Sequence, residues 1–444
     1  MPPRADRVDD VADVGTAGGA TGRLPAIDCP PSSVGLAGGG GSAWRVVVGF
    51  GVVSLAADMA YEGARSVYGP LLASLGASAV VVGLVTGAGE AAALLLRLVS
   101  GPLADRTRRY WWLTILGYGL TAVCVPLLAV TPLLGGAGLA VAAALILAER
   151  LGKAIRSPAK SALLADAASR VGLGRGLGVH KALDQVGAFA GPLLVAAVVA
   201  MAAGSLTPGL AVLTVPGLVA MLLLLAIRAR AEGLPAAGRA TASVSTPVTG
   251  RRPLPARFHL FAAAMALCTA GLVTFGLIGF HLVRAGVVAP AAVPLMYAAA
   301  MAAGALAALV TGVVYDRAGP WVLLALPALI AAVPALVFGG GLPLAVGGVV
   351  VWGAAVGVQD STVKALVADL VPRERRATAY GVFAAVQGAG ALAGGAAAGG
   401  LYEFSLASLV VAVAVTQAAA LVVLVGVLAT ARPASEARRR HTAP

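Results

Sequence analysis

Long apolar runs alternate with short polar links along most of this chain. The first run begins near residue 45 and the last ends near residue 430. A helix that crosses a membrane needs about 20 mainly apolar residues, and each run is long enough. The pattern predicts twelve membrane helices, at residues 45–74, 78–101, 111–131, 136–158, 176–201, 206–228, 258–283, 290–314, 320–339, 342–367, 378–401 and 406–430.

The composition agrees with an all-α polytopic membrane protein. Hydrophobic residues make up 59% of the chain and charged residues only 11%, whereas soluble domains carry about 25% charged residues. The net charge of +13 does not indicate nucleic-acid binding, because the basic residues lie in short links between apolar runs. Cys29, Cys124 and Cys268 are too far apart to form a metal or disulfide motif. We expect no cofactor and no metal.

The basic residues also predict the topology. Lysine and arginine are concentrated in alternate links, at Arg106, Arg108, Arg109, Lys160, Arg170, Arg175, Arg317, Arg373, Arg375 and Arg376. The intervening links, near residues 77, 131–135, 204 and 339–341, carry almost none, with Arg284 as the exception. Basic links stay in the cytoplasm. The number of spans is therefore even, and both termini of this multi-pass protein are expected on the cytoplasmic side of the plasma (inner) membrane.

Similar sequences recur in the two halves of the chain. SALLAD at 161–166 matches KALVAD at 364–369, and the same spacing of 203 relates Asp184 to Gln387 and Gly187 to Gly390. Parallel repeats of six helices place a transporter's substrate site between the halves. We therefore expect two six-helix pseudo-repeats around a central cavity. The predicted segments are a disordered tail (1–43), the first bundle (44–228), a cytoplasmic loop (229–257), the second bundle (258–430) and a basic tail (431–444).

Two charged hairpins carry a family resemblance. GPLADRTRR at 101–109 and GVVYDRAG at 312–319 are similar to the loop motif of the major facilitator superfamily, and the resemblance covers residues 45–430. The stretches 149–167 and 176–192 resemble a prokaryotic branch with charged fourth and fifth helices. The resemblance implies contacts that gate the inner face, made by Gly101, Asp105, Arg106, Gly312, Asp316 and Arg317.

The hairpins depart from the family pattern at two positions. Arg108 stands where the family usually has glycine, and Pro320 stands where it usually has arginine. Glycine adopts a positive φ without steric cost. We therefore expect the first turn to differ in shape from that of the family.

Ionisable residues inside the spans are the candidate site residues. Each costs roughly 2.5–3.5 kcal/mol at a helix centre, so such residues usually face a cavity or a partner. The candidates for substrate binding or proton coupling are Asp58, Glu62, Arg65, Glu90, Arg97, Glu149, Arg150 and Asp184. The second half has few charges in its spans, and its notable polar residues are Gln359, Asp360, Lys364 and Gln387. The chemistry is therefore predicted to lie mostly in the first half.

Two interpretations of these charges remain open. Asp58 and Glu90 are either protonatable carboxylates or part of a set of structural ion pairs. Glu62 with Arg97 and Asp58 with Arg150 are examples of such pairs. Pairing is favoured for Glu62, Arg65 and Arg97. Pairing and gating are favoured for the stripe of Glu149, Lys153 and Arg156 beside Arg150. His180 and Lys181, near the cytoplasmic boundary, are expected to extend to the lipid headgroups.

These features predict a secondary active transporter that moves a small solute by alternating access. Proton-coupled efflux is the favoured form, since many relatives with this hairpin export drugs. Ion-coupled uptake of a small organic solute or anion is the alternative, because Arg65, Arg97 and Arg150 would suit an anion. A membrane sensor is a third, weaker reading. The chain has no GxxxxGK[ST] motif, so ATP drive within the chain is not expected. Its four histidines are scattered, so it is not expected to be an enzyme. We expect a monomer in the bilayer, with a small-molecule substrate and protons as partners.

Overall fold

The fold is a bundle of helices, as the apolar runs predict. A backbone in the hydrocarbon core must satisfy its hydrogen bonds within the segment, and helices do this. The computed structural model describes residues 40–169, 171–232, 253–372 and 375–430, and none of these residues forms a strand. The predicted tails up to residue 39 and from 431, and the central loop over 233–252, lie outside the described residues.

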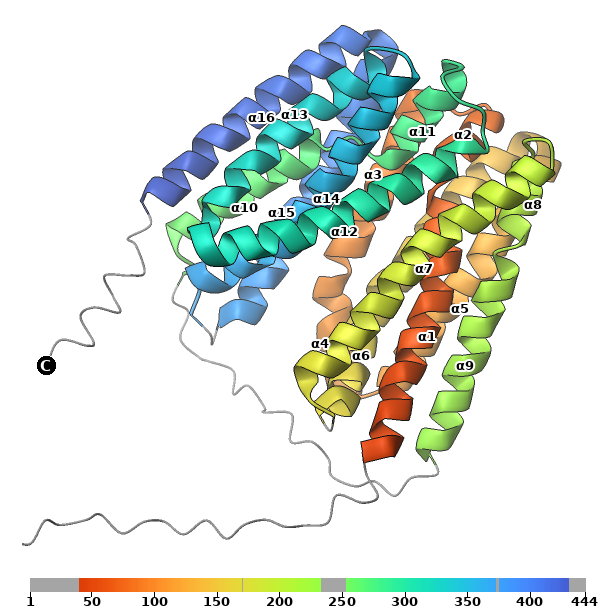
Figure 1. The fold of residues 1–444 in the computed structure, drawn as a ribbon, viewed down its shortest axis with the longest axis vertical. Helices are drawn as coiled ribbons and strands as arrows, with labels where there is room; N and C mark the ends of the chain where they lie inside the picture. The colour runs from red at the N-terminus through yellow and green to blue at the C-terminus, as the bar shows by residue number, and fades with distance from the viewer. Residues whose placement is uncertain (1–39, 170, 233–252, 373–374, 431–444) are drawn as a thin grey trace, which may run out of the picture. The chain divides into compact units, whose positions relative to one another are not determined.

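The first half contains nine α-helices and one short 3₁₀ helix within its described residues (Figure 1). Their bounds are α1 Gly40–Arg65, α2 Tyr68–Ser74, α3 Ala79–Leu95, α4 Arg97–Thr107, α5 Tyr110–Leu128, η1 Thr131–Ala137, α6 Gly138–Ser169, α7 Leu173–Met201, α8 Leu206–Ala211 and α9 Thr214–Glu232.

The described part of the second half follows with α10 Ala256–Gly271, α11 Phe275–Arg284, α12 Ala292–Ala318, η2 Gly319–Leu324, α13 Ala325–Phe338, α14 Leu342–Leu370, α15 Arg376–Phe404 and α16 Leu406–Ala429. Several predicted spans are therefore pairs of shorter helices. The spans predicted at 45–74, 78–101, 206–228 and 258–283 each contain a break.

The two charged hairpins are mostly helical, which corrects their expected form as loops. Helix α4 continues to Thr107 and leaves only Arg108 and Arg109 before α5. Helix α12 likewise includes all of the second copy up to Ala318.

Eleven helical runs in the described part are long and apolar enough to cross a membrane. One of them, Ala292–Phe338, has 47 residues. A straight helix of that length would extend about 70 Å, more than twice the roughly 30 Å of a hydrocarbon core. Gly319, with φ of 73°, interrupts this run between α12 and α13, which are separate helices in Figure 1. The eleven runs therefore correspond to the twelve predicted crossings.

The two halves repeat one packing arrangement. Gly187 and Gly191 of α7 lie so close to α1 that a Cβ atom on either would be 2.2 Å from a carbonyl oxygen, of Leu55 and Met59 respectively. Small residues allow such close approach between membrane helices. The glycines 203 positions later meet the backbone of α10 in the same way: Gly390 lies against Ala266, and Gly394 against Ala270. The repeat seen in the sequence is thus a repeat of helix packing.

The bundle has a basic end and an opposite end. The basic end carries Arg106, Arg108, Arg109 and Arg175 in the links and helix termini around α4–α5 and α6–α7. The opposite end carries the links at 75–78, 202–205, 285–291 and 339–341.

The halves touch most closely toward the opposite end. A Cβ atom on Gly83 of α3 would lie 2.2 Å from the carbonyl oxygen of Gly395 in α15. Toward the basic end α15 lies beside α4, the helix that follows α3. There a side chain lies between the two backbones, because Gly381 of α15 meets the side chain of Leu98 in α4. The backbones therefore diverge from the opposite end toward the basic end.

Candidate functional site

A network of ion pairs joins helices α1, α3 and α6 of the first half. Glu90 Oε1 lies 2.5 Å from Arg65 Nη2 and 3.3 Å from Arg150 Nη2. Glu62 Oε2 lies 3.7 Å from Arg65 Nη1, and Glu149 Oε2 lies 3.8 Å from Arg150 Nε. We call these five residues the central charge network. The ionisable positions predicted from the sequence are therefore assembled largely with one another.

Tyr61 links a further positively charged residue, Lys153, to the central charge network. Arg150 donates a hydrogen bond to the Tyr61 hydroxyl, and Lys153 Nζ lies 3.8 Å from the centre of the Tyr61 ring. The carboxylates of Glu62, Glu90 and Glu149 are thus matched by Arg65, Arg150 and Lys153. Buried charges are tolerated when they are paired in this way.

Glu149 is the most deeply buried of these carboxylates, with 0% of its surface exposed. Its Oε1 accepts a hydrogen bond from Thr121, which in turn accepts one from Arg156 at 2.6 Å. Its Oε2 has no hydrogen-bond partner among the described residues. Glu149 therefore lies within a set of side-chain contacts that includes Arg150, Thr121 and Arg156.

Glu90 lies between the guanidinium groups of Arg65 and Arg150 and forms an ion pair with each. The Glu90 side chain is 31% exposed and that of Arg65 is 23% exposed, so solvent reaches the network on this side.

Glu62 connects the network to the second half. Tyr297 of α12 donates a hydrogen bond of 2.5 Å to Glu62 Oε2, and both residues are buried. The suggested pair of Glu62 with Arg97 is not formed, because Arg97 begins the separate helix α4 and is exposed. The suggested pair of Asp58 with Arg150 is also absent from the described contacts.

Asp58 instead pairs with another carboxyl group, that of Asp184 on α7. The two carboxyl groups lie close to each other across the contact between α1 and α7. Lys181 Nζ lies 2.8 Å and Lys160 Nζ 4.0 Å from the Asp184 oxygens. Two adjacent carboxylates repel each other, which is the arrangement in which two acidic groups can share one proton. We call Asp58 and Asp184 the carboxyl pair.

His180 differs from its expected position. It is only 7% exposed, and its Nε2 lies 3.5 Å from Ser54 Oγ. Ser54 also accepts a hydrogen bond of 2.8 Å from Lys160. His180 therefore faces the α1–α6–α7 contact beside the carboxyl pair instead of the headgroups. Ser54 had no signal in the sequence, being a single hydroxyl within an apolar run.

Within the part of the chain that the structure describes, the hairpin residues make no hydrogen bond or ion pair between the halves. Asp105 is exposed and accepts a hydrogen bond of 3.1 Å from Tyr110 in the same hairpin. Arg106, Asp316 and Arg317 are also exposed at the basic end. At Gly101 and Gly312 a Cβ atom would meet no atom within 4 Å, so neither glycine makes a close contact among the described residues.

The turn at Arg108 corrects the expected change of shape. Arg108 has φ of 53° and ψ of 16°, the left-handed conformation, and ends α4. The chain therefore makes a left-handed turn with an arginine, at the conformational cost that a glycine would avoid.

In the second half, two side-chain amides contact one hydroxyl group. Gln359 Nε2 donates to Thr269 Oγ1 at 2.7 Å, and Gln387 Nε2 lies 3.4 Å from the same oxygen. Within the described residues no group of three His, Cys, Asp or Glu could hold a metal ion. The side chain of Lys364 lies outside what the structure describes.

Comparison with known proteins gives a family match over most of the chain. The model of the Major Facilitator Superfamily matches residues 50–358 and 288–444. An uncharacterised protein of Mycobacterium tuberculosis is 51% identical over 385 residues, which cover 86% of this chain and 93% of that protein. An uncharacterised transporter of the same superfamily from Methanocaldococcus jannaschii is 28% identical over 144 residues, 32% of this chain and 35% of that one.

Solved transporter structures share the fold. A crystal structure of the nucleoside transporter NupG superposes with a TM-score of 0.68 at 14% identity, covering 86% of this chain and 99% of that one. The peptide transporter POT, crystallised with sulfate, gives 0.63 at 16% identity over 87% of this chain and 94% of that one. At such low identity the likeness concerns the fold alone.

Proposed function

The chain belongs to the Major Facilitator Superfamily of secondary transporters, and on this premise we propose that it exports a small solute in exchange for protons. The exchange takes place by alternating access across the cell membrane. The basic end faces the cytoplasm, as the positive-inside rule requires, and the protein acts as a monomer.

The observation that carries proton coupling is the carboxyl pair. Asp58 and Asp184 lie in contact within the first half, and 18% of the Asp184 side chain is exposed to solvent. A pair that shares one proton releases it when positive charge comes closer and regains it when that charge withdraws. Lys160, 4.0 Å away on α6, is placed to make this change when α6 shifts against α7.

The central charge network has a different role in this proposal. Arg65 and Arg150 both hold Glu90, so an anionic substrate would have to displace that carboxylate. This arrangement disfavours the alternative of anion uptake. In this proposal the network holds α1, α3 and α6 of the first half together.

Proton movement driven by solute tests the proposal. The purified protein is reconstituted in liposomes that enclose a pH-sensitive dye, and a panel of drug-like and polar solutes is added under an imposed pH gradient. We expect at least one solute to move protons in the direction opposite to its own. The Asp58→Asn variant should lose this proton movement while still exchanging labelled solute for unlabelled solute.

Asp369→Asn is the matched control, because this exposed carboxylate contacts Tyr315 in the second half and lies outside the carboxyl pair. It should retain proton movement. Solute transport that ignores the pH gradient, or proton movement that survives Asp58→Asn, would refute coupling through the pair.

A further inference from the structure

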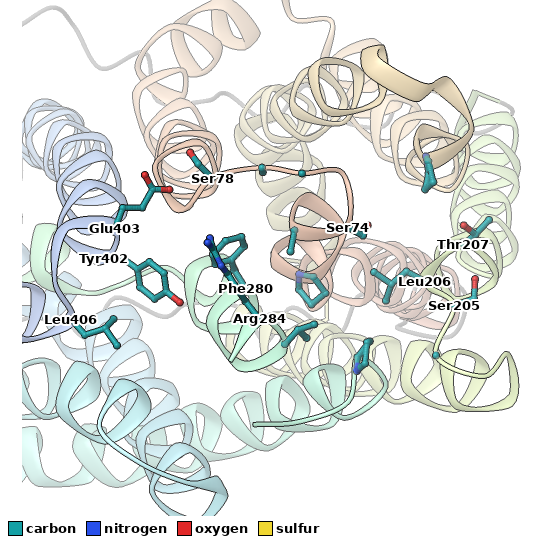
Figure 2. Close-up of a pocket in the computed structure, with 18 residues that line it drawn as sticks. Ser74, Ser78, Ser205, Leu206, Thr207, Phe280, Arg284, Tyr402, Glu403 and Leu406 are labelled. Atoms are coloured by element: carbon teal, nitrogen blue, oxygen red, sulfur yellow. The ribbon is translucent and has the colours of Figure 1, made fainter. Parts of the chain in front are cut away.

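Glu403 makes a contact between the halves at the opposite end of the bundle. It lies in the last turn of α15, and its Oε1 accepts a hydrogen bond of 2.7 Å from the backbone N–H of Ala79. Ala79 is the first residue of α3, in the other half. Figure 2 shows the Glu403 carboxylate beside Ser78, at the edge of a cavity of about 1210 Å³.

The position of Glu403 in its own helix is unfavourable. A helix carries partial negative charge at its C-terminal end, so a carboxylate in the last turn is repelled there. The same carboxylate is attracted to the start of α3, where backbone N–H groups lack partners within the helix. Ser78 accepts only from Val81, at 3.3 Å. Glu403 thus supplies the cap that Ala79 lacks, and supplies it from the other half.

This cap depends on direct contact between two backbones. A Cβ atom on Gly399 of α15 would lie 2.5 Å from the carbonyl oxygen of Ala79, and one on Gly83 of α3 would lie 2.2 Å from that of Gly395. No side chain separates the two helices here. When the halves part at this end, Glu403 must therefore lose Ala79 altogether and pass into the solvent of the cavity.

We propose that Glu403 stabilises the state in which the opposite end is closed, by capping α3 of the other half only in that state. The inference rests on the alternating access proposed above, but it involves neither the carboxyl pair nor a coupling ion. Glu403 is a positioning residue: it changes the balance of the two states without touching the solute.

A variant of the donor complements variants of Glu403. Ala79→Pro removes the N–H that Glu403 accepts, and proline is favoured at the first position of a helix. The preceding Ser78 has φ of −77° and ψ of 162°, the extended conformation that proline requires of its neighbour. Helix α3 should therefore form normally in this variant.

The balance of states is read as a distance between spin labels. Leu133 in the first half and Leu342 in the second are both exposed at the opposite end. Cysteines at these two positions carry the labels, in a background where Cys29, Cys124 and Cys268 are replaced by alanine. Pulsed electron paramagnetic resonance on protein in lipid nanodiscs then gives the ratio of the short to the long distance.

We expect Glu403→Ala, which removes the acceptor oxygen, and Ala79→Pro each to lower the ratio of closed to open protein about five-fold, which corresponds to about 1 kcal/mol for a lost cap. The double variant should fall little further, because both changes remove one contact. Arg284→Gln is the control: it removes a charge from the same cavity, but Arg284 stacks only on Phe280 of its own helix.

Three results would overturn the proposal: an unchanged distance distribution in Glu403→Ala, a double variant that shows the product of the two single effects, or an equal shift in Arg284→Gln. The distances are measured without transport, so failure of this proposal is distinguishable from failure of proton coupling. If Ala79→Pro does not fold, Glu403→Ala with the Arg284→Gln control decides the question alone.

Discussion

Neutralising Glu90 distinguishes a structural ion pair from a proton carrier. In Glu90→Gln the two guanidinium groups of Arg65 and Arg150 would share a neutral amide in place of a carboxylate. Removing one partner of a fully buried ion pair costs about 3–5 kcal/mol. Glu90 is 31% exposed while Arg150 is only 5% exposed, so solvent offsets part of this cost. We expect a loss of about 2 kcal/mol in the free energy of unfolding.

A second substitution tests whether charge balance is the cause. Arg65 lies 2.5 Å from Glu90, and Arg65→Gln removes the surplus positive charge that Glu90→Gln creates. The double variant should therefore lose less stability than the sum of the two single variants, with a coupling of roughly 1–2 kcal/mol. Asp316→Asn is the control, because this exposed carboxylate at the basic end should change stability by no more than about 0.5 kcal/mol.

Unfolding by sodium dodecyl sulfate in mixed micelles, followed by tryptophan fluorescence, measures these free energies. The solute-driven proton assay is run on the same preparations. If Glu90→Gln unfolds like the parent protein but no longer moves protons, Glu90 is the proton carrier and the structural reading of the central charge network is wrong.

Three other variants test the contacts between the halves and the turn after α4. Tyr297→Phe removes a hydrogen bond between the halves while keeping the ring. In the spin-label assay it should weaken closure of the opposite end by about 1.5–3 kcal/mol. An unchanged distance distribution would show that this bond does not contribute to closure. Gly83→Ala should prevent backbone contact between α3 and α15 and increase the fraction of protein with the long spin-label distance. Gly101→Ala is its control and should not, because Gly101 has open space around it. Equal behaviour of the two variants would contradict the packing argument. Arg108→Gly places glycine at a residue with a left-handed backbone conformation and should raise the free energy of unfolding by up to about 1 kcal/mol in the detergent titration. A clear loss of stability would show that the arginine side chain contributes more than the conformation costs.

The fold was largely predictable because the bilayer imposes simple rules. The length of the apolar runs and the placement of arginine in alternate links predict the twelve crossings, and the glycines 203 positions apart mark equivalent packing contacts. The breaks within spans were not predictable. Helix α1 ends at Arg65 and α10 ends at Gly271, and neither end is followed by a polar link of the kind that separates two spans.

Exposure and helix rotation explain which parts of the site were missed. Arg97 stands seven residues after Glu90, which predicts both on one helical face. Leu96 between α3 and α4 keeps a right-handed helical conformation, but the Arg97 side chain is exposed, and spacing alone does not reveal exposure. The contact of Asp58 with Asp184 joins α1 to α7 and depends on the rotation of both helices. Spacing within one helix contains no information about that rotation.

Closure of the opposite end depends on several small contacts. Among the described residues, three side-chain hydrogen bonds join the halves: Tyr297 with Glu62, Glu403 with Ala79, and Thr86 with Thr274 at 2.8 Å. A typical hydrogen bond contributes about 1 kcal/mol and one to a charged group about 1.5–3 kcal/mol. With about 1 kcal/mol each for the Glu403 cap and the Thr86–Thr274 bond and about 1.5–3 kcal/mol for the Tyr297–Glu62 bond, their sum is about 3.5–5 kcal/mol, slightly below the roughly 5.5 kcal/mol that converts a 1:99 mixture of two states into 99:1. Removing one bond should therefore change the ratio of the two states by a measurable factor and still leave both states populated. A transporter must pass through both states, so both must stay accessible.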